Sequence, residues 1–317
     1  MIKYMHYNGS KNTIKKGGGT DYKIPSKKDF VWIFMQNPSD AETKRVCKDF
    51  ELDNKYFKTF SKENRSVRYS INPLIFVFMD YYLENHKIKS SRILFVLKEN
   101  VLVISMQHKN TFHNELFDKL ADSLEHTDEK SLLGIMYRFL MEDVEENYEV
   151  VEKIESIIMD LEKDIDKGNS KRVQDVIKFK RAIYRMSRRF WGSAKIVFVI
   201  KKGLTPLKVD VESVLLLDDV YNTYMHQIDI LSSAKEMLSD ILQVYEVKAQ
   251  NDLNTIIKKL TAITLILMVP NIIASAFGMN FKFIPELEWE YGFYMAIGLM
   301  LLSIIISLSF FKKREWI

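Results

Sequence analysis

The sequence predicts an α/β cytoplasmic domain, followed by a long helical stalk and a two-helix transmembrane hairpin. Residues 260–281 and 291–311 contain no Lys, Arg, Asp or Glu, and each stretch is long enough to cross a hydrocarbon core of about 30 Å as a helix. Residues 207–269 contain no Pro or Gly, which predicts a continuous helix of about 95 Å. Over residues 1–126, short β-rich runs alternate with helical ones, as in an α/β domain.

The composition fits a soluble domain joined to a small membrane part. The chain is 47% hydrophobic and 28% charged, which is too polar for a carrier with many spans. The formal net charge is +4 without a separate basic face in the soluble part, so we expect no nucleic-acid partner. The single cysteine, Cys47, excludes an intrachain disulfide framework. The six histidines show no metal-ligand spacing, and without a nucleophile–base motif we do not expect an enzyme.

Local patterns predict the elements of the domain at residues 1–126. The first 28 residues are polar and predict a loose arm or short edge strands. Val31–Met35 is typical of a strand, and Ser39 or Asp40 caps a helix that follows. We expect three further strands at residues 73–78, 92–97 and 101–106, of which the last two form a hairpin. A helix at residues 111–125 would close the domain.

Residues 127–203 predict a helical hairpin. Apolar residues recur at helical spacing over Met136–Ile165, and Gly168 suits the turn. Residues 142–166 hold eleven acidic residues and two lysines, whereas residues 171–189 hold eight basic residues and one acid. Antiparallel packing would pair these charges as weak surface ion pairs of a solvated hairpin. Attraction of cations by the acidic arm is the alternative interpretation.

The remaining chain predicts a stalk and a membrane hairpin. A stalk helix at residues 204–259 is too long to bury its surface within one small domain, so we expect copies of the chain to surround it in an oligomer. It leads into the first transmembrane helix, 260–281. A loop at 282–290, a second transmembrane helix at 291–311 and a basic tail at 312–317 complete the chain.

Charges beside the spans predict the orientation in the cell membrane. Lys258 and Lys259 precede the first span, and a basic tail follows the second. Positively charged flanks remain cytoplasmic, so both termini are predicted inside the cell. The connecting loop, with Glu286 and Glu288, would then face outward.

Polar and small residues follow one face of the first span at heptad spacing. The residues at these positions are Asn254, Thr261, Met268 and Ser275 in one series, and Ile257, Thr264, Asn271 and Gly278 in the other. Such a stripe can support helix packing in lipid, or it can line a water-filled path. Amides without partners are costly in lipid, so the asparagines favour the path. Neutral oxygen rings suit hydrated Mg²⁺, which sheds water reluctantly, and Leu260 and Met268 would form apolar constrictions.

The end of the chain resembles a known family. Gly278-Met279-Asn280 after a hydrophobic helix, then Ile284-Pro285-Glu286-Leu287, a second span and a basic tail, is similar to the CorA magnesium and cobalt transporter family. The resemblance implies a homopentameric funnel that carries Mg²⁺, with Co²⁺ as a second ion, inward down its electrochemical gradient. Gly278, Met279 and Asn280 would form the outer selectivity ring.

The resemblance also implies an inner pore and a regulatory site. The inner pore asparagine maps onto Asn254, and the hydrophobic gate residues map onto Ile257, Leu260, Thr264 and Met268. Magnesium sensors of the family lie between adjacent cytoplasmic domains. Asp219, with its neighbour Asp218, fits the stalk half of that site, and Asp80 or Glu84 would supply the other half. Bound Mg²⁺ would favour the closed state.

Two alternatives remain open from the sequence. A transporter of the same family can carry Zn²⁺, Ni²⁺ or Co²⁺, although the retained Met279 favours magnesium. A membrane-tethered helical scaffold without transport would instead show an apolar heptad seam in the first span.

Overall fold

The computed structural model describes most of the chain as two compact units, Met1–Asp240 and Ile241–Ile317. The residues it describes are 1–60, 66–71, 73–85, 87–108, 111–125, 130–167, 170–205, 209, 211–279 and 289–317. Asn280, Glu286 and Glu288 therefore lie outside the described residues.

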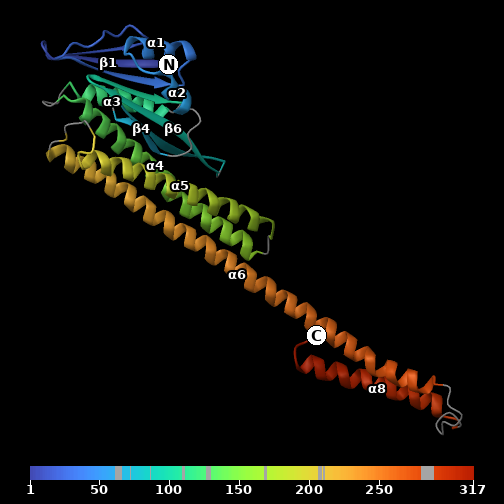
Figure 1. The fold of residues 1–317 in the computed structure, drawn as a ribbon. Coiled ribbons are helices and arrows are strands. Elements are labelled where there is room, and N and C mark those ends of the chain that lie inside the picture. Colours follow the sequence, from blue (N-terminus) through green and yellow to red (C-terminus); the bar gives the residue numbers. More distant parts are fainter. Residues whose placement is uncertain are drawn as a thin grey trace. The chain divides into compact units, whose positions relative to one another are not determined.

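The first unit is built on a seven-stranded sheet in the order β2-β1-β3-β7-β6-β5-β4 (Figure 1). β3 and β7 pair in parallel, and the other neighbouring strands pair antiparallel. The strands are β1 (Ile2–Asn8), β2 (Thr13–Gly18), β3 (Phe30–Gln36), β4 (Val67–Ile71), β5 (Leu74–Glu84), β6 (Lys87–Lys98) and β7 (Val101–Met106).

Two short helices cover one face of the sheet. α1 (Asp40–Asp49) and α2 (Asn54–Phe60) share a core cluster with Ile33 of β3. α1 begins as predicted, because the Ser39 hydroxyl accepts a hydrogen bond from the Glu42 N–H while the Glu42 carboxylate accepts one from the Ser39 N–H. This reciprocal pairing satisfies two backbone donors at the helix start.

The other face is covered by α3 (Thr111–Ser123) and α4 (Leu132–Asp166). Trp32 of β3 packs against Phe117 of α3, with ring centroids 4.4 Å apart, and also contacts Phe139 of α4. All seven residues of β3 are buried, because a central strand with helices on both faces loses the alternation of polar and apolar residues.

The start of the chain differs from the expected loose arm or short edge strands. β1 is an inner strand that pairs with β2 on one side and β3 on the other, and Tyr4 and Met5 are buried. The polar appearance of this segment comes mainly from the solvent-accessible edge strand β2, whose residues are half-buried or exposed. Local composition alone did not reveal this pairing.

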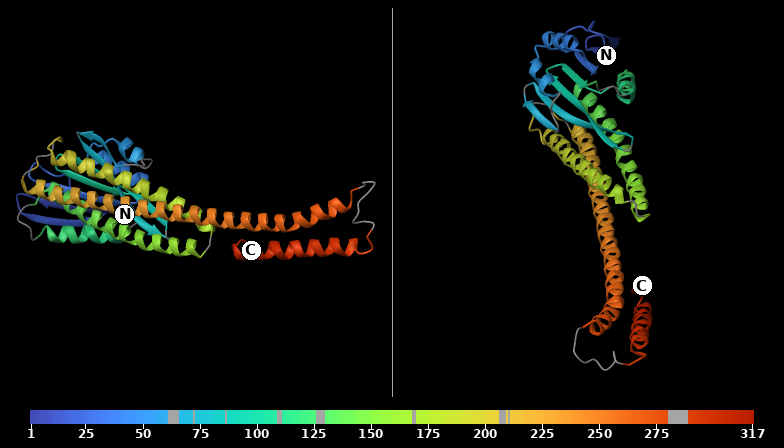
Figure 2. Two further views of the ribbon diagram at one scale, coloured as in Figure 1. Left: turned by 90° about the horizontal axis from the view of Figure 1, so that it is seen from below. Right: turned by 90° about the vertical axis from the view of Figure 1, so that its right-hand side faces the viewer.

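Three helices form the rest of the first unit. α4 and α5 (Val173–Lys201) fold back on each other, joined through a 3₁₀ turn at Ser170–Arg172. The first part of α6 (Val211–Phe277) packs against both of them. Gln227 of α6 donates a hydrogen bond to the backbone carbonyl of Val144, at 2.7 Å, and Lys180 of α5 donates one to Ser239, also at 2.7 Å. Figure 2 shows these helices from two further sides.

The second unit consists of the rest of α6 and the apolar helix α8 (Gly292–Lys313). Both helices contain segments long and apolar enough to cross a membrane, with mean hydropathy of 2.0 and 2.2. They pack through Ala262 and Ile266 of α6 and Phe311 of α8. Pro270 lies within α6 without ending it.

α6 ends at Phe277. The predicted end of the first span, Phe281, lies outside the described residues. The Gly278 N–H still bonds to the Ala274 carbonyl, whereas the Met279 N–H bonds three residues back, to Ala276. This change of bonding pattern tightens and ends the helix. The predicted domain boundaries after residues 126, 203 and 259 stay predictions.

Candidate functional site

Most of the heptad stripe of α6 lies on the side of the helix opposite to α8, and Asn254 and Thr261 lie at its edge, about 80–100° from Ala262. Within the second unit, Ala262 and Ile266 form the contact with α8. Asn271 lies nine residues beyond Ala262, and both Ile257 and Ser275 lie nine residues from Ile266. Nine residues correspond to two and a half helical turns, so these side chains project about 180° away from α8. The stripe is therefore not a dry contact between the two spans of one chain.

The predicted pore residues that the structure describes are exposed in the single chain. These residues are Asn254, Ile257, Leu260, Thr261, Thr264, Met268, Asn271, Ser275, Gly278 and Met279. Thr264 donates its hydroxyl hydrogen to the backbone carbonyl of Leu260, at 2.9 Å, so its oxygen can accept a hydrogen bond from outside the helix. The face consequently presents acceptor oxygens beside apolar side chains, as a narrow hydrated path requires. Its role as a pore lining remains a prediction.

The four acids predicted as a regulatory site occupy different environments. Asp219 is exposed on α6, whereas its neighbour Asp218 forms an ion pair with Lys201 of α5. Glu84 is exposed at the end of β5 and lies 3.6 Å from Lys89. No contact recorded among the described residues joins the α6 acids to either acid of β5.

The fourth acid, Asp80, does not fit its predicted place. Its side chain is fully buried, so it does not lie on a surface that a neighbouring subunit could reach. The expectation that Asp80 supplies a ligand between subunits is wrong for this position. Of the two β5 candidates, only Glu84 is accessible to another chain.

Asp80 instead belongs to a buried cluster that the sequence analysis missed. His113 of α3 and Asp143 of α4 are also fully buried, and His113 Nε2 lies 2.8 Å from Asp143 Oδ1. One candidate ligand atom from each residue lies within 4.8 Å of the others. The three residues are about 30 positions apart in the chain, so no local motif announces them; only the sheet and helix packing brings them together.

Burial and mutual charge perturb the titration of this cluster. Burial and the charge of Asp143 raise the pKa of Asp80 to about 7. Burial also raises the pKa of Asp143, which the hydrogen bond and charge of His113 partly oppose. Burial alone would lower the pKa of His113, but the hydrogen bond to Asp143 and the surrounding carboxylates raise it overall. The carboxyl pKa values rise because burial disfavours the charged form of each group, and the nearby charges offset this effect only in part.

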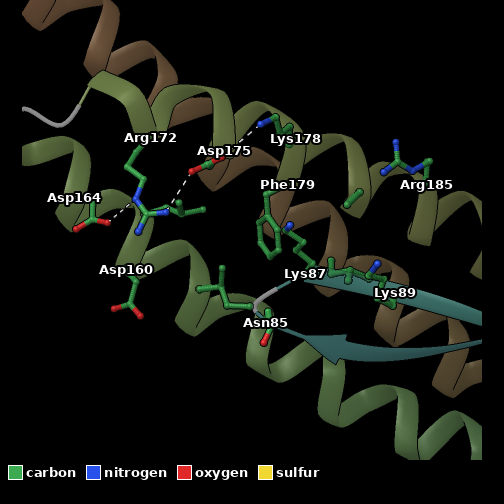
Figure 3. Close-up of a pocket in the computed structure, with 14 residues that line it drawn as sticks. Asn85, Lys87, Lys89, Asp160, Asp164, Arg172, Asp175, Lys178, Phe179 and Arg185 are labelled. Atoms are coloured by element: carbon green, nitrogen blue, oxygen red, sulfur yellow. Dashed lines mark hydrogen bonds and ion pairs between the residues drawn. The ribbon is translucent and has the colours of Figure 1, made fainter.

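A pocket of about 550 Å³ lies where the β5–β6 hairpin meets α4 and α5 (Figure 3). Arg172 donates hydrogen bonds to Asp164 of α4, at 3.0 Å, and to Asp175 of α5, at 3.2 Å. Lys178 lies 3.8 Å from Asp175. The Arg172–Asp164 pair joins the two arms, whereas Asp175 belongs to the basic arm itself, so the predicted charge pairing is present at this end of the hairpin through one ion pair.

Fold and site together define a two-span membrane protein with a large α/β unit and a polar face on its longest helix. The family model described as CorA-like Mg²⁺ transporter protein matches residues 27–313. The chain therefore belongs to this family of membrane transporters.

Known proteins agree with this assignment. The cobalt/magnesium transport protein CorA of Thermotoga maritima is 25% identical over 237 residues, which cover 73% of this chain but 66% of that protein. The magnesium transport protein CorA of Wolinella succinogenes is 23% identical over 303 residues, 92% of each chain.

Solved structures show the same fold. The complete CorA magnesium transporter of Methanocaldococcus jannaschii matches with a TM-score of 0.83 and 19% identity, covering 99% of this chain and 98% of that one. The full-length CmaX protein matches with a TM-score of 0.68 and 12% identity, covering 99% and 97%. The α/β domain, the long helix and the apolar C-terminal helix predicted from the sequence are thus confirmed.

Proposed function

We propose that this protein carries Mg²⁺, with Co²⁺ as a second ion, into the cell through a pore lined by α6. The observation that supports this proposal most strongly is the polar stripe of α6, which faces away from α8 in a chain that belongs to the CorA-like family. Names of relatives include both magnesium and cobalt transport. Zn²⁺ or Ni²⁺ as the main ion, or a scaffold without transport, has no comparable support.

The proposal requires several copies of the chain around one axis. A single α6 presents one row of amide and hydroxyl groups, whereas a homopentamer would convert each stripe position into a ring of five. Mg²⁺ binds its waters tightly, so rings that hydrogen-bond its water shell can pass the hydrated ion without stripping it. Exposed apolar side chains such as Ile256 and Ile263 would contact neighbouring subunits or lipid.

Orientation follows from the charged flanks in the same proposal. Lys258, Lys259 and the basic tail would anchor the cytoplasmic side, and the loop with Glu286 and Glu288 would attract cations at the outer mouth. Gly278, Met279 and Asn280 would form the selectivity ring at that end. The α/β domain, helical hairpin and stalk would then form the cytoplasmic part, with boundaries as predicted from the sequence.

Regulation is assigned to Asp219, with Glu84 as the candidate partner from a neighbouring subunit. Both side chains are exposed, so two subunits can bring them together. Carboxylates opposed across an interface repel each other until a divalent ion bridges them, and ion occupancy would therefore favour the closed assembly.

Ion flux into proteoliposomes tests the transport proposal. We expect Asn280→Ala to abolish most Mg²⁺ uptake while the protein still assembles, because the amide ring that receives the hydrated ion is lost. Asn251→Ala is the matched control, since Asn251 lies on the α8 side of α6, eleven residues before Ala262. Mg²⁺ uptake by Asn280→Ala at the wild-type rate would refute the selectivity-ring assignment.

A further inference from the structure

The interior of the first unit contains a second place where a cation can bind. Asp80 of β5, His113 of α3 and Asp143 of α4 converge from three separate elements, and all three side chains are fully buried. Their candidate ligand atoms lie within 4.8 Å of one another. This cluster lies inside one subunit and includes none of the α6 residues of the predicted pore and neither of the exposed acids Asp219 and Glu84.

Two polar atoms of the cluster lack partners in the described part of the chain. Asp80 Oδ1 and His113 Nδ1 are buried and make no hydrogen bond to any described residue. A buried acceptor or donor without a partner costs about 1–3 kcal/mol, and most native proteins avoid it. The unpartnered Asp80 Oδ1 points to a ligand that completes the cluster, whereas His113 Nδ1 lies on the side of the ring away from Asp143 and would not contact an ion bound at Nε2.

The charge of the cluster specifies the sign of that ligand. Two carboxylates face one imidazole in a closed interior, and a dication bound by all three would displace their protons. The charged neighbours that influence Asp80 are Asp143, His113 and Glu146, and the one that influences Asp143 is His113. A dication would balance two carboxylates more completely than the single imidazole of His113 does.

The structure assigns this cluster, Asp80, His113 and Asp143, as a binding site for one divalent first-row transition-metal ion such as Co²⁺ or Zn²⁺. One imidazole nitrogen and two carboxylate oxygens form a mixed donor set, and imidazole selects these ions over Mg²⁺. The 2.8 Å separation of His113 Nε2 and Asp143 Oδ1 resembles that of neighbouring ligands at about 2.0–2.1 Å from one metal. A carboxylate oxygen of Asp80 lies within 4.8 Å of both.

Surrounding side chains already orient the two carboxylates. Ser91 donates a hydrogen bond to Asp80 Oδ2 at 3.0 Å, which leaves Oδ1 for the ion. Asn147 accepts a hydrogen bond from the Tyr81 N–H at 2.8 Å and donates to Oδ2 of the Asp143 carboxylate at 3.4 Å. Such outer partners fix metal ligands in place, and here they connect β5 to α4 at the site.

The closed position of the cluster shapes the experiment. An ion enclosed by buried side chains would enter during folding and exchange slowly, unlike ions in a pore or at a subunit surface. The full-length protein is therefore produced in medium containing Co²⁺, purified in detergent and treated with a chelator, and the retained cobalt is measured by elemental analysis. We expect about one ion per chain in the wild type, and X-ray absorption at the cobalt edge should show one imidazole ligand.

Matched variants connect the retained ion to the cluster. His113→Gln and Asp80→Asn should lose the ion, whereas His108→Gln should keep it, because His108 is an exposed histidine of the same unit. Circular dichroism and size-exclusion chromatography identify any variant that fails to fold. If a variant does not fold, the X-ray absorption spectrum of the wild type tests the assignment by showing whether an imidazole binds the cobalt. A chelated wild type without cobalt, as expected for a merely protonated network, overturns the assignment. So does cobalt that is retained without an imidazole ligand or equally in folded His113→Gln. None of these results depends on whether the protein transports ions.

Discussion

Tyr4 and Gly17 show how one residue permits an element. They are paired across β1 and β2, and a Cβ atom at Gly17 would come within 2.4–2.7 Å of the Tyr4 ring. The ring is buried and packs edge-on against Tyr22, with centroids 6.0 Å apart. Only a glycine at position 17 leaves room for the Tyr4 ring over β2. This glycine of the Gly17-Gly18-Gly19 run therefore allows β1 and β2 to pair.

We predict that Gly17→Ala destabilises the protein by about 1–3 kcal/mol, the usual cost of overpacking. The neighbouring Gly18 is the control, because a Cβ there meets only the Ile2 carbonyl oxygen at 3.7 Å, an ordinary contact. Gly18→Ala should be neutral or slightly stabilising through loss of unfolded-state entropy. Thermal unfolding of both purified variants measures the difference, and equal midpoints would contradict the proposed contact.

At the scale of the element, α6 combines two chemically different faces. Ala262 and Ile266 pack on α8, whereas the stripe at heptad spacing presents oxygens half a turn away. A helix with a polar face in a membrane needs either a polar partner or water. The second span of the same chain supplies neither, because its contact lies on the opposite side. The polar face of α6 therefore requires other copies of the chain or a hydrated path.

Two polar residues on different faces of α6 test this division. Asn254 lies in the stripe, whereas Thr255, seven residues before Ala262, lies on the α8 side and about 100° round the helix from Asn254. We expect Asn254→Leu to lower Mg²⁺ flux about tenfold or more. Leucine would lengthen the apolar part of the pore, and a rise of about 1.4 kcal/mol in the free-energy barrier to ion passage lowers the rate tenfold. Thr255→Leu should leave flux near the wild-type rate. Similar losses in both variants would mean that the stripe is not the conducting face.

At the scale of the whole molecule, the proposed regulation depends on contacts that one chain cannot make alone. Asp219 is exposed. Burial, and to a smaller extent the charge of Asp219, raises the pKa of Tyr137 on α4. Asp218 is already neutralised by Lys201. Asp219 therefore retains an unbalanced charge at the surface, where a divalent ion can join two subunits.

We predict that Asp219→Lys reduces the protection that Mg²⁺ gives the soluble part against proteolysis, because a fixed ammonium group replaces the ion and removes its ligand. Digestion of purified protein with and without Mg²⁺ measures this effect. Asp160→Lys, an exposed acid on α4, is the control and should retain the protection. Identical magnesium dependence in Asp219→Lys and wild type would discard the site.

Local patterns in the sequence predicted a large part of the architecture. β7 matches its expected range, the Ser39 cap is present, and the lack of Pro and Gly before Val269 corresponds to the continuous helix α6. These features depend on side-chain periodicity, capping and backbone freedom, which neighbours in sequence determine. The family assignment likewise follows from residues close together at the end of the chain.

Tertiary structure alone decided the features that join distant residues. The sequence determined a membrane hairpin with a polar stripe, because hydropathy and heptad spacing are local properties. It did not determine that β1 is an inner strand, that Asp80 is closed to solvent, or that His113 and Asp143 meet it in the core. Strand order and helix packing set these contacts across long separations in the chain, and burial then changes the chemistry of each charged group.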